Sequence, residues 1–455
     1  MKRSLGALGV VSLVLLVAVG LTASQSRPRS PAAAAPPNII VILADDLGWD
    51  DVSYHGSAVQ TPTLDRLARE GVTLHQHYVS PTCSPSRVAL LTGRNPARFN
   101  VFAPLEDTTT VRPVDARLPF ALQARGYSTH LSGKWHIGAT PEHRPLHYGF
   151  TTTYGGLRGQ IDPYTHRYKF GDHRTWHRND QFVEEEGHVT RLIADEAIRV
   201  IESSKSRPFF LYIAHHAPHF PLHEPPVWIE PYVKIFEDVW RRHHAASVSH
   251  MDAEIGRVIE ALDRTGQRAN TLIVFSSDNG GQRNWPATPA EYNGRYPPHT
   301  MLGMNTPLRG WKTEVYEGGI RVPAFVTWPA RLAGGRRLDS PISIMDWAPT
   351  LIGIAGGTVD PAWRLEGRDL MPLLTGTTST PEQRRFYWNH AGSQWAVRDG
   401  DWKLVAQASG AVELFDLATD PYEKTDLKDR QPDRVRRLRD LLAAERARDG
   451  EAVAR

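Results

Sequence analysis

The chain has 455 residues, of which 40% are hydrophobic and 23% are charged, values that are typical of a soluble globular protein. This length allows one large domain, or two unequal ones, with a substantial core. The formal net charge of only +3 does not indicate a nucleic-acid partner, although arginine and histidine side chains could still line a site for an anion.

The first 37 residues are predicted to precede the folded domain. A basic start, MKRS, is followed by an apolar run over residues 5–21 and then by small residues, the pattern of a secretory signal peptide. We assign residues 1–26 to this signal and residues 27–37, rich in proline and alanine, to a flexible linker. The expected location is periplasmic or extracellular, with no stable membrane insertion after cleavage. Because the apolar run is close to the lower length limit of a membrane span, an uncleaved N-terminal anchor is the alternative.

Residues 38–375 are predicted to form an α/β domain. Residues 38–45 are a β-branched run that ends in aspartate, and residues 61–71 have the threonine cap, early proline and final glycine of a helix. Further apolar runs, with a long helical stretch among them, follow at residues 207–216, 243–265, 271–281 and 321–329. Uninterrupted apolar strands between helices predict a mixed, mostly parallel central sheet flanked by helices.

Residues 376–455 are predicted to form a smaller subdomain. Short alternating runs cover residues 385–390, 394–406 and 412–421, which favours antiparallel strands. Asp399 and Gly400 lie where a tight hairpin turn would fall. An amphipathic helix over residues 434–448 closes the chain.

Two strand ends carry paired oxygen ligands. Asp45 and Asp46 follow the first apolar run, and Asp278 and Asn279 follow a later one. Either pair alone could simply lead the chain into a turn. Ligand sites in open α/β sheets gather at the carboxyl ends of strands. The two pairs together therefore predict a site for Ca²⁺ or Mg²⁺ rather than Zn²⁺.

The stretch SPTCSPSRVALLTGR, residues 80–94, contains the only cysteine of the chain, Cys83. A lone cysteine is usually a small buried apolar residue. Here, however, Pro85 can occupy the first turn of a helix that Gly93 ends, so Cys83 would lie at the helix N-terminus, where backbone N–H groups favour an anion. Arg87 follows about one helical turn later and could return toward the same point as an oxyanion donor.

Three further clusters could contribute to a site. Lys134 and His136 lie in GKWHIG after a short strand, and Lys312 lies in RGWKTEVYEGG. Four histidines follow the run at residues 207–214: His215, His216, His219 and His223. A single lysine is more often a solvated surface residue, and a single histidine near a strand end is as often structural as functional.

The five residues CSPSR, followed by LLTGR, resemble the signature of the formylglycine-dependent sulfatases, in the alkaline-phosphatase-like superfamily. The blocks DDLGWDD, TPTLDRLAREGV, GKWHIG and SSDNGG stand in the order of that family, between about residues 38 and 329. SSDNGGQ and the PLRGWK…EGG block are most similar to the arylsulfatase B, or N-acetylgalactosamine-4-sulfatase, branch. The resemblance implies an alkaline-phosphatase-like fold with a smaller C-terminal subdomain.

The resemblance also implies a metal and a modified nucleophile. Cys83 would be oxidised to formylglycine by a formylglycine-generating or other sulfatase-maturing enzyme, and its hydrated aldehyde would attack sulfur. One Ca²⁺ per chain, with Mg²⁺ the less expected ion, would be held by Asp45, Asp46, Asp278 and Asn279, and the modified Cys83 would complete the shell.

Five more residues take roles by the same resemblance. Arg87 and Lys134 would hold the hydrated aldehyde, and His136 would be the base beside it. His219 and Lys312 would contact the sulfate and the leaving oxygen. His219 is preferred to its three neighbours only because its context, PHFP, matches the family.

The predicted activity is hydrolysis of sulfate esters, either of a sulfated carbohydrate of the glycosaminoglycan type or of aryl sulfates. A phosphonate monoester or phosphodiester hydrolase is the alternative, because the superfamily shares the metal platform, and a non-catalytic glycan-binding module is a third reading. Residues that could line a sugar pocket, or could equally be packing residues, are Trp285, His299, His390 and Trp395.

Overall fold

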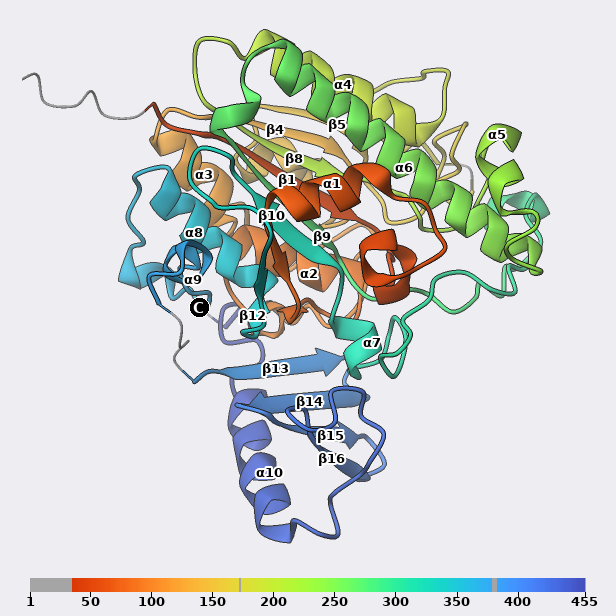
Figure 1. Ribbon diagram of the computed structural model, residues 1–455. Coiled ribbons are helices and arrows are strands. Elements are labelled where there is room, and N and C mark those ends of the chain that lie inside the picture. The colour runs from red at the N-terminus through yellow and green to blue at the C-terminus, as the bar shows by residue number, and fades with distance from the viewer. Residues whose placement is uncertain (1–34, 172, 379–382, 455) are drawn as a thin grey trace, which may run out of the picture. The chain divides into compact units, whose positions relative to one another are not determined.

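The computed structural model describes residues 35–171, 173–378 and 383–454 (Figure 1). The predicted signal peptide, residues 1–26, and most of the predicted linker lie outside these ranges. Within the described ranges, no helix combines the length and the apolar character that crossing a membrane requires.

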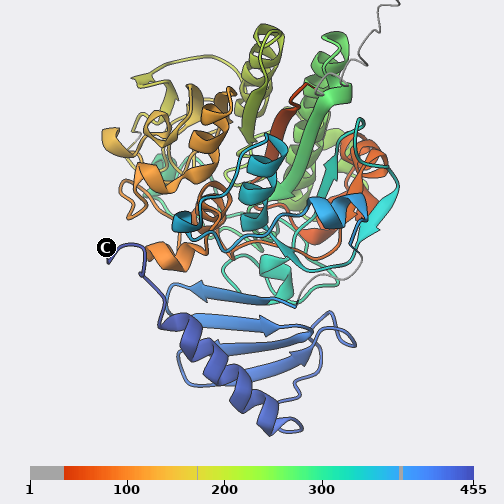
Figure 2. The ribbon, with the colours of Figure 1, turned by 90° about the vertical axis from the view of Figure 1, so that its left-hand side faces the viewer.

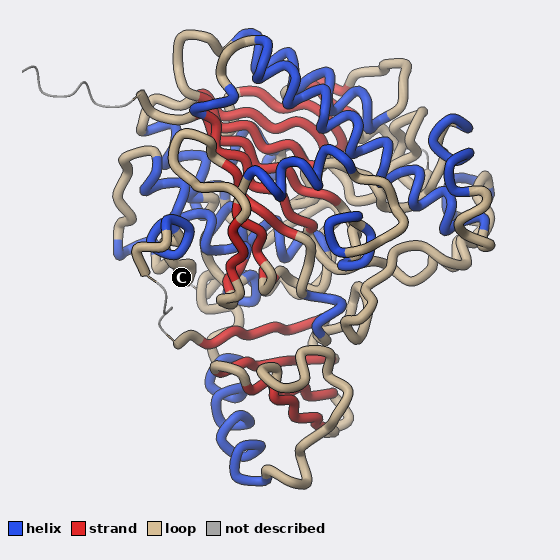
Figure 3. The backbone as a smooth tube through the Cα atoms, in the orientation of Figure 1, coloured by secondary structure: helices blue, strands red, loops and turns tan. Residues whose placement is uncertain are grey.

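A ten-stranded sheet runs through the larger part of the fold, and Figure 3 shows it between two layers of helices. Its central strands are mutually parallel and stand in the order β9 (Thr271–Ser277), β1 (Asn38–Ala44), β8 (Phe209–Ala214), β4 (Ser128–Gly133) and β5 (Thr152–Gly156). Shorter strands extend both edges: β10 (Ala324–Thr327), β2 (Val72–Leu74) and β11 (Arg336–Leu338) beyond β9, and β6 (Trp176–Arg178) and β7 (Gln181–Phe182) beyond β5. This confirms the predicted mixed, mostly parallel sheet.

The continuous apolar runs of the central strands are explained by burial on both faces. Ile39 and Val41 of β1 belong to one hydrophobic cluster, whereas Ile40 and Ile42 belong to the other. Side chains alternate between the two faces of a strand, so a strand covered on both faces needs apolar residues at every position.

Each face of the sheet is covered by its own set of helices (Figures 1 and 2). One face carries α1 (Pro62–Glu70), α4 (Val189–Ser203) and α6 (Val239–Arg264). The other carries α2 (Cys83–Thr92), α3 (Arg117–Ala124) and α8 (Trp347–Ile354). The predicted helix at residues 243–265 begins earlier, at Val239, because the Asp238 carboxylate accepts hydrogen bonds from the backbone N–H groups of Trp240 and Arg241.

Short elements complete this part of the chain. They are the helices α5 (Pro226–Ile229), α7 (Glu317–Ile320) and α9 (Met371–Thr375), and a two-stranded sheet of β3 (His77–Tyr78) and β12 (Ile342–Ser343).

The C-terminal residues form a separate antiparallel sheet with one helix across it (Figure 2). Its strands are β13 (Arg385–His390), β14 (Gln394–Asp399), β15 (Trp402–Gln407) and β16 (Val412–Asp416), and the helix is α10 (Pro432–Arg446). The predicted hairpin turn is confirmed, since Asp399 pairs with Trp402 and Gly400 has a φ of 63°. The division of the chain between residues 375 and 376 stays a prediction.

A fully buried charge cluster joins this sheet to α7. The Lys403 ammonium on β15 lies 2.9 Å from Glu317 Oε1 and 2.8 Å from Glu423 Oε1. Burial raises the pKa of Glu423 to about 7, although Lys403 opposes the shift. One buried cation therefore serves two buried carboxyl groups.

Replacement of Lys403 by alanine should destabilise the protein strongly, because it leaves Glu317 and Glu423 buried together without their cation. We expect the free energy of unfolding to fall by about 3–5 kcal/mol, measured by urea unfolding. Lys428→Ala is the control, because Lys428 forms an exposed pair with Asp426 and should cause no measurable change. Equal effects of the two substitutions would contradict a structural role for the cluster.

Candidate active site

The two acidic strand ends predicted from the sequence meet at one edge of the sheet. β1 and β9 are adjacent and parallel, and Ala44 pairs with Ser277, so the residues that follow them are neighbours. The Asn279 side-chain amide donates to Asp46 Oδ1 over 2.8 Å, and the Asp46 backbone N–H donates to Asp278 Oδ1 over 3.3 Å. Asp45, Asp46, Asp278 and Asn279 are all buried.

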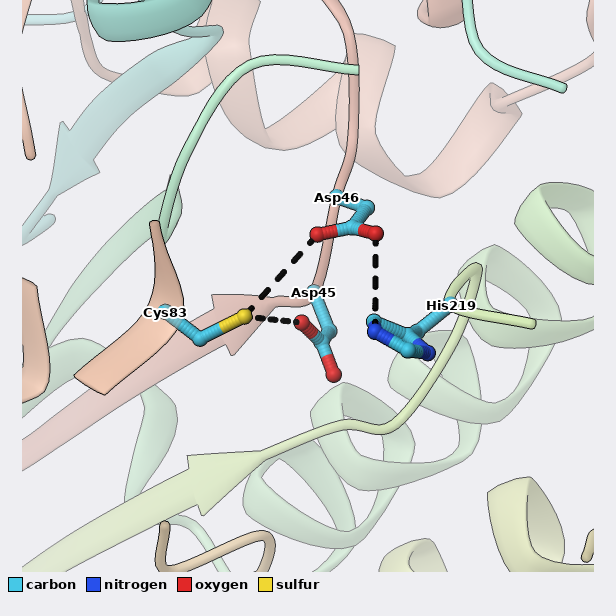
Figure 4. Close-up of side chains that lie close together, drawn as sticks. All are labelled: Asp45, Asp46, Cys83 and His219. Carbon is cyan, nitrogen blue, oxygen red and sulfur yellow. Dashed lines mark hydrogen bonds and ion pairs between the residues drawn. The ribbon is translucent and has the colours of Figure 1, made fainter. Parts of the chain in front are cut away.

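Cys83 begins α2 and points into this group (Figure 4). Its sulfur lies 3.4 Å from Asp45 Oδ1 and 4.0 Å from Asp46 Oδ1. Burial, together with the Asp278 carboxylate, raises the pKa of the Cys83 thiol. The thiol is therefore protonated and only 1% exposed, and it is a poor nucleophile as it stands. The helix ends at Gly93, which has a φ of 66°, as the sequence predicts.

Arg87 is fully buried beside the group, but its guanidinium already has partners. Nε and Nη2 donate to Asp278 Oδ2 over 3.1 and 2.7 Å, and Nη1 donates to the Lys134 carbonyl over 2.9 Å. The hydroxyl of Tyr212, on β8, lies 3.4 Å from Nη1. The side chain therefore holds Asp278 in place, and it lies close enough to Cys83 for a thiolate there to raise the pKa of Arg87.

Two lysines from distant segments lie against the aspartates. Lys134 Nζ is 2.5 Å from Asp45 Oδ2, and Lys312 Nζ is 2.7 Å from Asp46 Oδ1. Burial lowers the pKa of Lys312, but the Asp46 carboxylate outweighs burial and holds the pKa above its usual value. Both ammonium groups therefore face the point on which the aspartates converge.

The donor atoms fit a hard divalent cation. Ligand atoms of Asp45, Asp46, Cys83 and His219 all lie within 4.8 Å of one another. Burial raises the pKa of Asp45 to about 7, with Lys134 opposing and Asp278 adding to the shift. Asn279 Oδ1 is buried without a hydrogen-bond partner among the described residues. A cation bound here would satisfy that oxygen and offset the carboxylate charges.

His136 is held in an unusual backbone conformation beside the group. Its φ is 60°, and neither ring nitrogen has a hydrogen-bond partner in the part of the chain that the structure describes. Burial and the charges of Lys134 and Arg87 lower the pKa of His136, so the ring is neutral. Gly159 packs against this ring: a Cβ at Gly159 would lie 2.2 Å from His136 Cε1.

Among the histidines at residues 215–223, the one that lies against the aspartates is His219. Its Nδ1 donates to the Phe220 carbonyl over 2.6 Å, which leaves Nε2 facing Asp46 Oδ2 at 3.7 Å (Figure 4). Burial and the charges of Lys312 and Lys134 lower the pKa of His219. His223, in contrast, is exposed.

Two residues near the group were not selected from the sequence. His216 is buried, and burial is the largest cause of its lowered pKa. The next largest causes are the charges of Lys134 and Arg87, so His216 lies close to these cations. Tyr212 contacts Arg87 from β8. A hydroxyl in the middle of an otherwise apolar strand was the available signal for Tyr212, whereas nothing in the sequence separates His216 from its neighbours.

The four residues considered for a sugar pocket fall in two places. Trp285 and His299 pack edge to face with ring centroids 4.8 Å apart, and Trp285 also stacks on Phe220 at 4.8 Å. His390 and Trp395 lie on β13 and β14 of the C-terminal sheet, where the Arg446 guanidinium covers the Trp395 ring. Only the first pair is linked to the candidate site, through Phe220 and His219.

A comparison with family models decides the family. The Sulfatase model matches residues 37–357, and the model described as N-sulphoglucosamine sulphohydrolase, C-terminal, matches residues 310–447. The chain belongs to the sulfatase family. As a sulfatase it is a sulfuric ester hydrolase, which confirms the family and activity predicted from the residues around Cys83, while the arylsulfatase B branch stays a prediction.

Individual sulfatases are similar over most of the chain. Arylsulfatase J of Mus musculus is 33% identical over 91% of this chain and 76% of its own length. N-acetylgalactosamine-6-sulfatase of Mus musculus is 32% identical over 80% of this chain and 69% of its own. The crystal structure of Ps i-CgsB in complex with k-i-k-neocarrahexaose matches with a TM-score of 0.81 and 30% identity, covering 91% of this chain and 94% of that one.

Gly159→Ala should impair this sulfatase by displacing His136, because the new methyl group would overlap the imidazole ring. A displacement of about 1 Å can reduce turnover by about 100-fold, so we expect a loss of that order in kcat/KM for an aryl sulfate. Gly353→Ala in α8 is the control, because nothing lies within 4 Å of its added Cβ. If Gly159→Ala folds normally and keeps full activity, the position of His136 is unimportant for turnover.

Proposed function

We propose that this sulfatase hydrolyses sulfate esters of a sulfated carbohydrate, and also accepts aryl sulfates, by means of a formylglycine made from Cys83 and one bound calcium ion. The observation that carries the proposal is the convergence of Cys83, three carboxylates and two lysine ammonium groups on one buried point. Hydrolysis of a sulfate ester needs cations that stabilise charge on the sulfate oxygens, and it needs a nucleophile held beside the sulfur. The lysines and the modified Cys83 would meet these two needs.

The metal ligands in this proposal are Asp45, Asp46, Asp278 and Asn279, together with the modified side chain at position 83. All the protein ligands are oxygen atoms of carboxylates and an amide, and the unpartnered Asn279 Oδ1 supports their assignment. We favour Ca²⁺ over Mg²⁺ because Mg²⁺ usually keeps several waters, whereas Ca²⁺ accepts many protein oxygens in flexible geometry. When bound, the ion would draw electron density from a sulfate oxygen.

The modification of Cys83 answers a problem that the thiol itself presents. A buried thiol with a raised pKa is a weak nucleophile. The hydrated aldehyde of formylglycine would supply one hydroxyl for attack on sulfur and a second whose deprotonation allows sulfate to leave. Because Cys83 is buried in the fold, the maturing enzyme must reach it before the chain has folded around it.

The remaining side chains take separate tasks in this proposal. Lys134 and Lys312, on opposite aspartates, would balance the negative charge that develops on the sulfate oxygens. His136, held neutral, can accept a proton from a hydroxyl at position 83. His219 carries its fixed N–H at Nδ1, so Nε2 is the atom that would exchange a proton with the leaving alcohol. Arg87 would hold Asp278 in place and, with Lys134, would hold the hydrated aldehyde.

A sulfated carbohydrate is favoured as the substrate by two relatives. One is named N-acetylgalactosamine-6-sulfatase, and the structure of another, Ps i-CgsB, was determined with an oligosaccharide bound. The N-terminal pattern of residues 1–26 supports export to the periplasm or the outside of the cell, where such glycans are found.

The activity is tested by sulfate release from 4-nitrophenyl sulfate and from a panel of sulfated sugars. Cys83→Ala should lower kcat at least about a thousandfold, since the nucleophile is removed. Lys134→Ala should lower kcat about 100-fold, as expected for one charge-stabilising group. A mass measurement on the peptide of residues 80–87 should show that Cys83 is converted in the active protein.

Lys428→Ala, far from the site in the exposed pair with Asp426, serves as the control and should behave as the unmodified sequence. Full activity in Cys83→Ala would exclude the formylglycine mechanism. Faster turnover of an aryl phosphonate monoester than of the aryl sulfate would instead favour the phosphonate monoester or phosphodiester hydrolase alternative.

Removal of divalent cations with EDTA should abolish turnover, and calcium should restore it at lower concentration than magnesium. Asp278→Asn should weaken calcium binding at least about tenfold, measured by titration calorimetry, because it removes a ligand charge and the partner of Arg87. Asp426→Asn, at a partly exposed position of the C-terminal part, should leave calcium affinity unchanged. Undiminished turnover in protein that elemental analysis finds free of divalent cations would contradict the metal site.

A further inference from the structure

A second buried group of ionisable residues lies behind the segment that carries His219. It consists of Glu224, His188 and His250, whose ligand atoms lie within 4.8 Å of one another. Glu224 follows His219 in the loop after β8, His188 caps the N-terminus of α4, and His250 lies within α6. Each side chain is more than nine-tenths buried.

Glu224 is the centre of this group. Its Oε2 lies 2.7 Å from His250 Nδ1 and 3.6 Å from His188 Nε2, and the Ser247 hydroxyl of α6 also hydrogen-bonds to it. Burial alone would raise the pKa of Glu224, but His188 and His250 outweigh burial and hold it below its usual value. The loop end is therefore tied by hydrogen bonds of one carboxylate to α6, and the same carboxylate lies against His188 at the start of α4.

Two histidines and a glutamate are also a common ligand set for zinc, but the hydrogen bonds here favour a different role. The Thr190 backbone N–H donates to His188 Nδ1 over 3.2 Å. In the neutral ring the proton then sits on Nε2, the atom that faces Glu224 and would have to bind the metal. Glu224 is hydrogen-bonded to His250 and Ser247, whereas His188 Nε2, at 3.6 Å, has no hydrogen-bond partner among the described residues. The two hydrogen bonds match a carboxylate held in place rather than a metal centre.

The loop from His215 to Glu224 is attached to the rest of the fold at four places. At its start, the His215 N–H donates to the Leu43 carbonyl over 2.9 Å, and the Ala217 carbonyl accepts from the Asp45 N–H over 3.0 Å. Farther on, the Leu222 N–H donates to His299 Nε2 over 3.2 Å. Glu224 makes the last attachment, and His219 lies between the first two attachments and the other two.

We infer that Glu224 is a positioning residue that fixes Nε2 of His219 against the leaving oxygen of the substrate. This inference rests on the proposed function. In the step concerned, a hydroxyl oxygen of the hydrated aldehyde at position 83 bonds to sulfur while its proton passes to His136. The S–O bond to the alcohol breaks, the alcohol oxygen keeps the electron pair, and that oxygen takes the proton that Nε2 carries in the protonated, imidazolium form of His219. A basic leaving group depends on this proton, whereas 4-nitrophenolate leaves readily without it.

The test compares kcat/KM for phenyl sulfate, which has the more basic leaving group, with kcat/KM for 4-nitrophenyl sulfate. Glu224→Gln should lower the ratio of the first to the second about tenfold, less than the loss of about 100-fold expected for His219→Ala, which removes the acid itself. In the His219→Ala background, Glu224→Gln should have no further effect on the ratio, because the group that it positions is gone.

Glu254→Gln is the matched control. Glu254 faces the other side of His250, with Oε1 3.9 Å from Nε2, and is as buried as Glu224, but it belongs to α6 and not to the loop. It should leave the ratio unchanged even if it lowers the melting temperature. If Glu224→Gln does not fold, Ser247→Ala removes one donor to Glu224 and should lower the ratio about threefold, a fraction of the full positioning effect.

The outcomes separate the inference from the proposed function. If His219→Ala changes the ratio but neither Glu224→Gln nor Ser247→Ala does, the inference on Glu224 is wrong and the role of His219 stands. An equal change caused by Glu254→Gln, or a further change in the His219→Ala background, would also overturn the inference. If His219→Ala leaves the ratio unchanged, the proposed role of His219 is wrong, and the inference fails with it.

Discussion

The candidate site depends on the burial of three carboxylates at the ends of two adjacent strands. Burial of like charges close together is costly unless each has a hydrogen-bonded cation. Lys134 on Asp45, Lys312 on Asp46 and Arg87 on Asp278 supply one cation each, from segments far apart in the sequence. Each cation pairs with its own carboxylate. The need to pair three buried carboxylates therefore fixes the lysine and arginine side chains before any ligand is present.

Close backbone contact brings Lys312 into this arrangement. A Cβ at Gly280 would lie 1.8 Å from the Gly318 carbonyl oxygen, so only glycine allows the chain after β9 to approach α7 so closely. The Lys312 N–H donates to the Gly281 carbonyl over 3.1 Å across the same contact. Gly280 and Gly281, next to Asn279, therefore allow this close backbone contact, and the contact sets the position of Lys312.

Sequence reasoning was successful where the signal is local or follows from the order of the strands. The paired acids were predicted to meet because parallel strands end at one edge, and Cys83 was placed at a helix start by Pro85 and Gly93. Partner choice was not predictable in this way. The role of Arg87 beside the modified Cys83 stays a prediction, but its guanidinium also lies on Asp278, a contact between α2 and the end of β9 that no spacing within α2 specifies. Glu224 was missed for the same reason.

The C-terminal sheet also supports the site, through the charge cluster that links it to α7. Lys312 and Glu317 belong to one continuous segment. The Glu317 carboxylate forms an ion pair with Lys403 of β15, and the Glu317 backbone N–H donates to Glu423 Oε2 over 2.7 Å. The Tyr78 hydroxyl donates a further hydrogen bond to the Glu317 carboxylate. A segment held at Glu317 has little freedom at Lys312, since the Thr313 N–H is also fixed, by the Pro81 carbonyl beside Cys83. The smaller sheet is thus linked by hydrogen bonds and ion pairs, through Glu317, to the segment that carries Lys312, and that segment is linked through Thr313 to the residues before Cys83.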